Sequence, residues 1–248
     1  MPGSVDQSQS TANLLLASLA PDDYSLLHPH LTQVKLQQQA ILQEPEQPIE
    51  QVYFPLTGMV SLVAVLSTGD TIEIAAIGRE GAIGTKIGLQ PQLAFAKAIV
   101  LLPCTALRIN IDKFQEAAQR SLAITHIATC AIDVMTTNLQ QSAACNAIHP
   151  IETRLARWLL HARDRYESDR LPLTQEFLSM MLGVRRTTVS LTAQTLQNAG
   201  LIRYRRGAIE LTDRKALEAM SCECYHTVRR NIAMIVETAQ RAGASHND

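Results

Sequence analysis

A long segment without glycine or proline, residues 113–149, is the feature that most limits how this chain can fold. Asp112 is suited to cap the start of a helix and Pro150 bounds the segment at its other end, so we expect one helix over 113–149. Within it, side chains suited to a helix interface recur at alternating spacings of three and four, which is typical of a coiled-coil seam. They are Ile124, Ile127, Ala131, Val134, Asn138, Gln141, Cys145 and Ile148.

This stripe predicts that the helix pairs in parallel with a second copy of the chain. Asn138 and Gln141 would lower the stability of such a seam but fix its register, as single buried amides do in coiled coils. The alternative is a long helix that packs on the rest of its own chain.

Residues 34–111 follow a different rule, because short runs with alternating polar and apolar side chains are separated by turn residues. Residues 71–74 alternate in this way, and every second side chain from Leu107 to Ile111 is apolar. Residues 67–70 have the composition of a hairpin turn. We therefore expect antiparallel strands in a small barrel or jelly roll, preceded by short helices over 11–31.

The composition is that of a globular protein, with 46% hydrophobic and 18% charged residues. No run reaches the about 18 unbroken apolar residues of a membrane-spanning helix, and residues 1–23 hold no basic side chain, so a secretory signal is not indicated. We expect a cytoplasmic protein with no membrane partner. The five cysteines form no CxxC pair, which indicates reduced thiols rather than disulfides or a four-cysteine metal site.

Charge is distributed unevenly along the chain. Residues 1–149 hold 7 basic and 12 acidic side chains, whereas residues 150–230 hold 14 basic and 9 acidic ones. Thirteen of those 14 cations are arginines, which suit phosphate groups and base edges. The charge predicts that the C-terminal part contacts an anion; a solvated basic surface is the alternative.

Residues 173–202 have the pattern of a helix-turn-helix. Thr174 can cap a first helix, and Gly183 can adopt the positive φ that ends it, so a second helix can begin near Arg186. In the second helix the apolar side chains lie on one face. The outward side chains are Arg185, Arg186, Thr187, Ser190, Leu191, Gln194 and Gln197. Cations at the start of the second helix are typical of a recognition helix that enters the major groove.

Residues 201–211 predict a hairpin after the second helix, with cations at its tip, Arg205-Arg206-Gly207. A two-stranded wing beside a helix-turn-helix is well placed to contact neighbouring phosphates.

Taken together, these features resemble the Crp/Fnr family of bacterial transcriptional regulators. The best matching segments are 152–165 leading into 173–212, followed by 52–84. The resemblance implies an α+β fold in three parts. A cyclic-nucleotide-binding-like β-roll with N-terminal helices takes up 1–112, a dimerisation helix 113–149, and a winged helix-turn-helix domain with a C-terminal helical tail 150–248. It implies no enzymatic activity, and as partners it implies a second copy of the chain, palindromic double-stranded DNA and RNA polymerase.

The resemblance also implies which side chains meet DNA. Family members read bases from the start of the second helix and one turn further on, which falls here on Arg186, Thr187 and Leu191, and the outward Arg185 and Ser190 complete the predicted base-reading set. Leu191 stands where the family often has arginine, and it could contact a thymine methyl group. The side chains predicted to contact the DNA backbone are Thr174, Gln175, Ser179, Thr188, Arg205 and Arg206.

The sensor half departs from relatives that bind cyclic nucleotides, which hold the phosphate with an arginine and the ribose with a glutamate. At the corresponding places this chain has residues 93–98, without arginine, and Gly84-Thr85-Lys86. A buried phosphate without a cation costs several kcal/mol, and Lys86 or Lys97 is the alternative partner. A cyclic nucleotide is therefore not expected, and any small-molecule effector remains unidentified.

No metal site is predicted from the sequence. Relatives with an iron–sulfur cluster need four cysteines, several near the N-terminus, whereas the first cysteine here is Cys104. We interpret His28-Pro29-His30 as an exposed turn and Cys222-Glu223-Cys224 as part of a C-terminal helix without partner ligands. Cys145 is expected as a buried thiol, with a bridge between subunits on oxidation as the alternative.

The sequence thus favours a homodimeric DNA-binding regulator whose roll transmits a signal through the long helix. A constitutive regulator with a degenerate, ligand-free sensor shares every C-terminal feature. An enzyme with a cupin-like metal site in the roll is disfavoured, because residues 34–111 contain no histidine.

Overall fold

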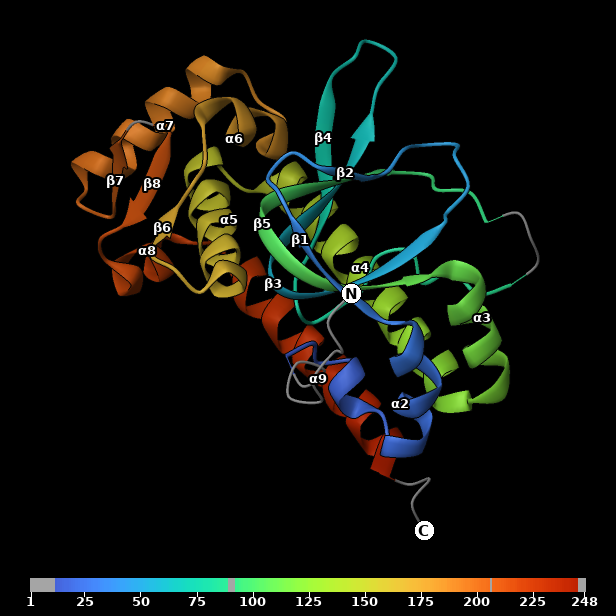
Figure 1. Cartoon of the computed structure of the whole chain (residues 1–248). Coiled ribbons are helices and arrows are strands. Elements are labelled where there is room, and N and C mark those ends of the chain that lie inside the picture. The colour runs from blue at the N-terminus through green and yellow to red at the C-terminus, as the bar shows by residue number, and fades with distance from the viewer. Residues whose placement is uncertain (1–11, 89–91, 206, 245–248) are drawn as a thin grey trace.

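The structure is a computed structural model that describes residues 12–88, 92–205 and 207–244 (Figure 1). It confirms the expected α+β fold, with an N-terminal antiparallel β-structure, a long helix and a C-terminal helix-turn-helix with a small sheet. Arg206, predicted to contact the DNA backbone, lies outside the described residues.

The N-terminal part is a β-roll built from five antiparallel strands. Its sheet has the order β1-β5-β3-β4, and β2 also pairs with β5. The strands are β1 (Thr32–Leu36), β2 (Ile41–Gln43), β3 (Gln51–Val65), β4 (Thr71–Ile77) and β5 (Lys97–Asn110), preceded by η1 (Leu16–Ser18), α2 (Pro21–Leu27) and η2 (His28–His30).

The predicted alternation is present in β5, where Leu107 and Ile109 are buried and Arg108 is exposed. The expected hairpin turn joins β3 to β4, and the backbone N–H of Leu66 donates to the carbonyl of Asp70 across it. Residues far apart in sequence thereby form one apolar interior, as period-two patterning requires.

The predicted single helix over 113–149 is two helices. Asn110, not Asp112, caps α3 (Ile111–Arg120), because its Oδ1 accepts a 2.9 Å hydrogen bond from the backbone N–H of Asp112. The chain becomes extended at Ser121, whose Oγ accepts from the backbone N–H of Ile124 and caps α4 (Leu122–Ile148). A serine side chain that caps a new helix also marks a helix boundary, so the absence of glycine and proline from residues 113–149 does not require one continuous helix.

Most side chains of the stripe predicted as a dimer seam are covered by their own chain. Asn138 donates to the carbonyl of Val134 in its own helix, and Gln141 donates to Cys224 Sγ, so both amides already make a hydrogen bond within their own chain. The buried members of the stripe are Ile124, Ile127, Ala131, Val134, Asn138 and Cys145, while Ile148 is exposed.

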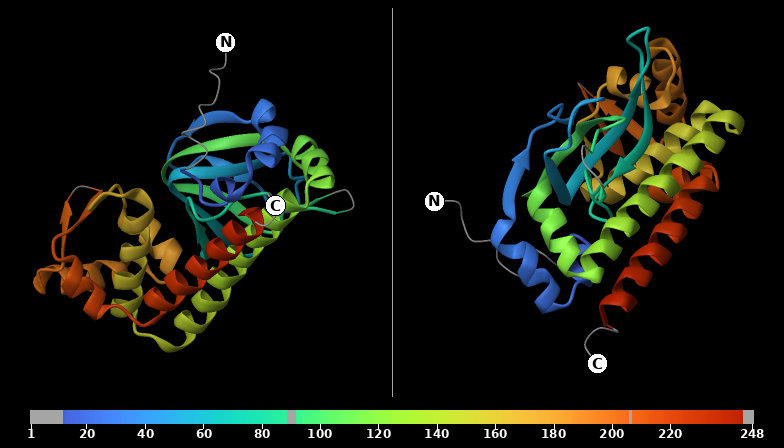
Figure 2. Two further views of the ribbon diagram at one scale, coloured as in Figure 1. Left: turned by 90° about the horizontal axis from the view of Figure 1, so that it is seen from below. Right: turned by 90° about the vertical axis from the view of Figure 1, so that its right-hand side faces the viewer.

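The partner of this stripe is formed by the β-roll and by α9 (Cys224–Ala244), which runs back along α4 (Figure 2). Gln141 near the end of α4 meets Cys224 at the start of α9, and Ala239 joins the cluster around Ile124, so the two helices are antiparallel. By length and composition α4 could also cross a membrane, with a mean hydropathy of 1.2. Its buried stripe is that of a core helix.

The C-terminal part begins at α5 (Ile151–Tyr166) and contains a three-stranded sheet of order β6-β8-β7. Its other elements are β6 (Arg170–Leu171), α6 (Gln175–Leu182), α7 (Arg186–Asn198), β7 (Ile202–Arg205), β8 (Ala208–Leu211) and α8 (Arg214–Met220).

The two parts share one apolar core. Met59 and Leu102 of the roll are fully buried in the same cluster as Leu155 and Leu159 of α5. Helix α6 also packs against β4 of the roll, so the β3–β4 hairpin lies beside the helix-turn-helix (Figure 1). The helix-turn-helix is therefore tied to the roll by the packing of α6 against β4.

Candidate nucleic-acid interface

The helix-turn-helix has the local structure that the sequence predicts. Thr174 Oγ1 caps α6 by accepting from the backbone N–H of Phe177 at 3.2 Å. Gly183 then takes the left-handed conformation, with φ +63°, which ends α6 and turns the chain toward α7. Val189, Ala193 and Leu196 bury one face of α7 against the domain.

The start of α7 projects from the domain. Arg185, Arg186 and Thr187 are exposed, and Leu191, one turn further, is 67% exposed. Thr188 is half-buried. These side chains lie at the helix end that recognition helices present to base edges in the major groove.

Ser190 differs from the other predicted base readers, because its hydroxyl is engaged within the protein. Its Oγ lies 2.9 Å from Gln175 Oε1 and 3.0 Å from the carbonyl oxygen of Arg186. The contact joins α7 to the first turn of α6. Ser190 and Gln175 are therefore placed to set the angle between the two helices, a role that spacing alone did not reveal.

Two other predicted backbone contacts also have partners within the chain. Thr174 Oγ1 is the α6 cap, and the Ser179 hydroxyl donates to the carbonyl of Glu176 at 2.7 Å. Thr174 Oγ1 is an acceptor in the cap, so its hydroxyl proton can be donated to a phosphate, whereas Ser179 would have to redirect the proton that it donates to Glu176.

The wing is the β7–β8 hairpin, and Arg205 is exposed near its tip. Gln197 of α7 accepts a 2.9 Å hydrogen bond from the backbone N–H of Tyr204, which fastens the wing to the recognition helix. Arg203 is exposed but lies 3.7 Å from Glu210 on the neighbouring strand. No pattern in the sequence predicts the Gln197 contact.

The positive charge of this part is only partly available to DNA. Arg154, Arg157 and Arg165 are buried. Arg214 and Arg229 lie 2.9 Å and 3.7 Å from carboxylate oxygens of Asp164. The net charge counted along the sequence therefore overstates the cationic surface, to which Arg185 and Arg186 at the start of α7 and Arg205 on the wing contribute exposed side chains.

The roll contains a cavity of about 270 Å³ with largely apolar walls. Lys86 is the cation among the described residues that line it, and its Nζ donates to the carbonyl of Leu93 at 2.5 Å and lies 4.0 Å from the centre of the Phe95 ring. Desolvation lowers the pKa of Lys86 below its usual value. Lys97, the other candidate phosphate partner, is paired with Glu44 at 3.1 Å.

The structure confirms Cys145 as a buried thiol and corrects the interpretation of Cys222 and Cys224 as lacking partner ligands. Cys145 is fully buried in its own chain with its sulfur 3.6 Å from that of Cys222, so it is not placed to bridge two subunits. Cys222 and Cys224 do have neighbours, because His149 and Cys145 approach them from the end of α4. Only the fold shows this grouping, since more than seventy residues separate its two halves in sequence.

Comparison with protein families finds two matches, one in the N-terminal part of the chain and one in the C-terminal part. The model of the cyclic nucleotide-binding domain matches residues 33–121, and the model of the Crp-like helix-turn-helix domain matches residues 153–220. The search of curated proteins finds no match.

Solved structures with the same fold share little sequence with this chain. A putative transcriptional regulator of the Crp/Fnr family from Eubacterium rectale superposes with a TM-score of 0.66 at 14% identity, covering 85% of this chain and 98% of that one. FixK2 from Bradyrhizobium japonicum gives 0.65 at 17% identity, covering 77% and 98%. The c-di-GMP-responsive regulator CLP from Xanthomonas campestris gives 0.64 at 16% identity, covering 78% and 100%.

Proposed function

The chain belongs to the Crp/Fnr family of DNA-binding transcription regulators, which are not enzymes, and from this premise we propose that it is a homodimer that binds a palindromic DNA site. The observation that carries the proposal is the exposed start of α7, with Arg185, Arg186 and Thr187, beside the cationic wing. Such a regulator acts in the cytoplasm, with RNA polymerase as a further partner.

The base-reading set in this proposal is centred on Arg186. An exposed arginine at the first turn of a recognition helix can bond bidentately to guanine O6 and N7, worth about 1–3 kcal/mol of discrimination. Leu191 contributes an apolar surface suited to a thymine methyl group. Thr174, Ser179 and Arg205 then set the orientation through phosphate contacts.

The proposed dimer uses the side of α4 that flanks its buried stripe. Ile132 and Leu139 are seven residues apart, so they share one side of the helix, and they are 41% and 42% exposed. Burial of this side against a second copy would pair the two chains, and a palindromic site then requires their recognition helices to lie about one DNA turn, roughly 34 Å, apart.

The same two side chains line the sensor cavity. An occupant of the cavity would therefore touch the proposed dimer face, which couples the sensor to the spacing of the recognition helices. The walls favour an apolar effector over a cyclic nucleotide, since Lys86 already donates to a backbone carbonyl. The alternative is a constitutive regulator whose cavity has no ligand.

Selection of duplexes from a random pool by the full-length protein tests the proposal. We expect an inverted repeat with half-sites one helical turn apart and affinity that falls steeply with salt. Enrichment of a single half-site, or of no sequence, would overturn the palindromic dimer. Native mass spectrometry of protein from its own host separates the two sensor alternatives. A dimer with extra mass identifies an effector. A ligand-free dimer that binds DNA with full affinity favours the constitutive form.

A further inference from the structure

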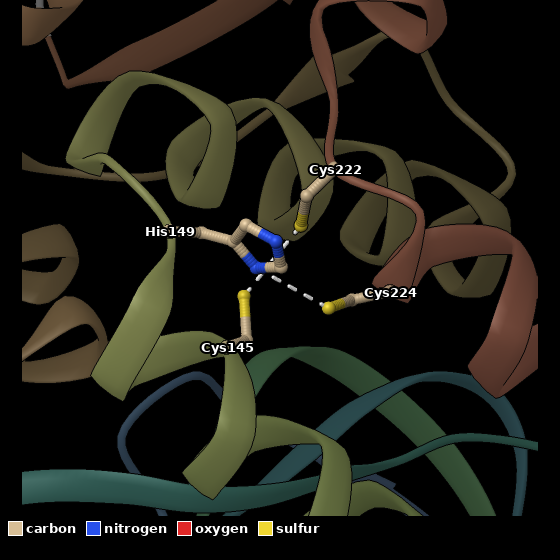
Figure 3. Close-up of side chains that lie close together, drawn as sticks. All are labelled: Cys145, His149, Cys222 and Cys224. Atoms are coloured by element: carbon tan, nitrogen blue, oxygen red, sulfur yellow. Dashed lines mark hydrogen bonds between the residues drawn. The ribbon is translucent and has the colours of Figure 1, made fainter.

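Four side chains with metal-binding atoms meet where α4 ends and α9 begins (Figure 3). Cys145 and His149 lie one helical turn apart at the end of α4, and Cys222 and Cys224 lie at the junction between α8 and α9. Their three sulfur atoms and one ring nitrogen all lie within 4.8 Å of one another. The three cysteines are buried and His149 is half-buried.

The spacing matches one tetrahedral ion. Zinc–sulfur bonds of about 2.3 Å and zinc–nitrogen bonds of about 2.0–2.1 Å place neighbouring ligand atoms roughly 3.5–3.8 Å apart. The sulfurs of Cys145 and Cys222 are 3.6 Å apart, and Cys224 Sγ is 3.5 Å from His149 Nδ1. Each pair joins the end of α4 to the α8–α9 junction, so the fold itself brings the ligand set together.

The surroundings orient the ligands in the manner of protein zinc sites. The Nε2 of His149 lies 3.3 Å from a carboxylate oxygen of Glu223, which favours the proton on Nε2 and leaves Nδ1 directed at the sulfurs. Gln141 donates from Nε2 to Cys224 Sγ at 3.0 Å. A carboxylate–histidine pair and an N–H···S bond are common outer partners of bound zinc.

We propose that Cys145, His149, Cys222 and Cys224 bind one zinc(II) ion in a Cys₃His site. On binding, the three thiols release their protons to solvent, and neutral His149 coordinates through Nδ1. No electron transfer is involved. Four protein ligands complete a tetrahedron, so the site is structural.

The ion would fasten α9 and the end of the DNA-binding domain to α4, next to His149-Pro150, where the long helix gives way to α5. The cluster of Cys145, Cys222 and Cys224 is a small apolar group apart from the three larger cores. The free energy of metal binding would thus supply at this junction what hydrophobic packing supplies elsewhere.

A mononuclear ion fits the spacing better than an iron–sulfur cluster, in which the ligands bind several irons and stand further apart. A disulfide between Cys145 and Cys222 would require their sulfurs to move to about 2.05 Å and would use only two of the four groups. The zinc proposal accounts for all four side chains and for the Glu223 contact.

Metal analysis of the full-length protein tests the proposal. We expect about one zinc per chain in protein purified without chelator, and loss of that zinc in Cys222→Ser and in His149→Ala. Cys130→Ala is the matched control, because Cys130 is also a buried cysteine of α4 but lies outside the cluster, and it should retain the metal. Zinc content that is unchanged in both cluster variants would overturn the site.

A titration of metal-free wild-type protein with Co(II) keeps the test independent of folding in the variants. Tetrahedral thiolate coordination predicts intense visible absorption that saturates at one equivalent and disappears on addition of zinc. Failure to bind either ion, bound iron with sulfide, or a Cys145–Cys222 disulfide in the freshly purified protein would each overturn the mononuclear zinc site. Glu223→Gln should weaken zinc binding about 10–100-fold, whereas Glu237→Gln, on an exposed pair of α9, should not change it.

Discussion

The indole Nε1 of Trp158 in the DNA-binding domain donates a 2.8 Å hydrogen bond to Oε1 of Glu73 in the β-roll. The other carboxylate oxygen of Glu73 accepts from Ser61 Oγ at 2.7 Å. Glu73 is 9% exposed, so its carboxylate is buried at the boundary between the β-roll and the DNA-binding domain.

This contact predicts a dependence of stability on pH. Desolvation raises the pKa of Glu73 above 4.5, against the opposing effects of its hydrogen bonds from Ser61 and Trp158 and of the charges of Arg157 and Arg165. The folded state therefore holds the proton more tightly than the unfolded state does. Protonated Glu73 therefore stabilises the folded state. This contribution is complete below the pKa that Glu73 has in the unfolded chain, and it is lost as the pH rises through its higher pKa in the folded protein.

We expect Glu73→Gln, which mimics the protonated form, to abolish this part of the pH dependence and to match or exceed wild-type stability at neutral pH, by on the order of 1 kcal/mol. Glu73→Ala should lower the free energy of unfolding by about 1–3 kcal/mol, because it leaves the buried Trp158 N–H without this acceptor. Urea unfolding across the acid-to-neutral range measures both. Glu44→Gln, on an exposed ion pair, is the control, and an identical pH profile for wild type and Glu73→Gln would contradict the assignment.

Two glycines in the same conformation provide a second test of the contact between the domains. Gly183 and Gly200 have φ of +63° and +74°, so alanine strains the backbone by about 1–2 kcal/mol at either position. A Cβ at Gly183 would also lie 2.5 Å from Cδ1 of Ile72 in the roll, whereas one at Gly200 would meet nothing within 4 Å.

We therefore expect Gly183→Ala to destabilise the protein by about 1 kcal/mol more than Gly200→Ala, because only the former displaces the Ile72 side chain at the contact between the roll and α6. Ile72→Val removes the obstructing Cδ1 atom and should recover that difference in the double variant. Thermal unfolding of the four proteins measures it. Equal effects of the two alanines would mean that α6 does not rest on β4 in solution.

The sequence predicted the local elements of this fold better than the contacts between them. Alternation identified β4 and β5, and Thr174 with Gly183 identified the ends of α6, because these signals depend on neighbouring residues. The burial of Glu73 depends on the packing of α5 against the roll, and no pattern among neighbouring residues predicts that packing.

The long helix shows why a periodic stripe does not identify its partner. Spacings of three and four residues predict that Ile127 and Val134 lie on one buried face, and they do. The pattern is the same whether a second chain or the chain's own roll and α9 cover that face. The Cys₃His cluster was missed for a related reason, because its halves come from α4 and the α8–α9 junction.

DNA-binding measurements distinguish the roles of two arginines. We expect Arg186→Ala to weaken binding to the selected site by about 1–3 kcal/mol and to relax the base preference at one position of each half-site, with little effect on non-specific DNA. Arg205→Ala should weaken specific and non-specific binding alike and reduce the salt slope by about one. Arg241→Ala, on α9 and ion-paired with Glu237, is the control. Equal specific and non-specific losses in Arg186→Ala would remove Arg186 from the base-reading set.

The location of the dimer face gives the last prediction. If Leu139 and Ile132 face a second copy, Leu139→Glu places two carboxylates at a desolvated symmetric contact, so the dimer should dissociate at concentrations where the wild type remains paired. The chain itself should stay folded, since Leu139 is 42% exposed in the single chain. Ile127→Ala, on the buried stripe, should instead lower the free energy of unfolding by about 2–5 kcal/mol. Sedimentation velocity reads the first effect and urea unfolding the second; a Leu139→Glu protein that remains a dimer would place the interface elsewhere on the molecule.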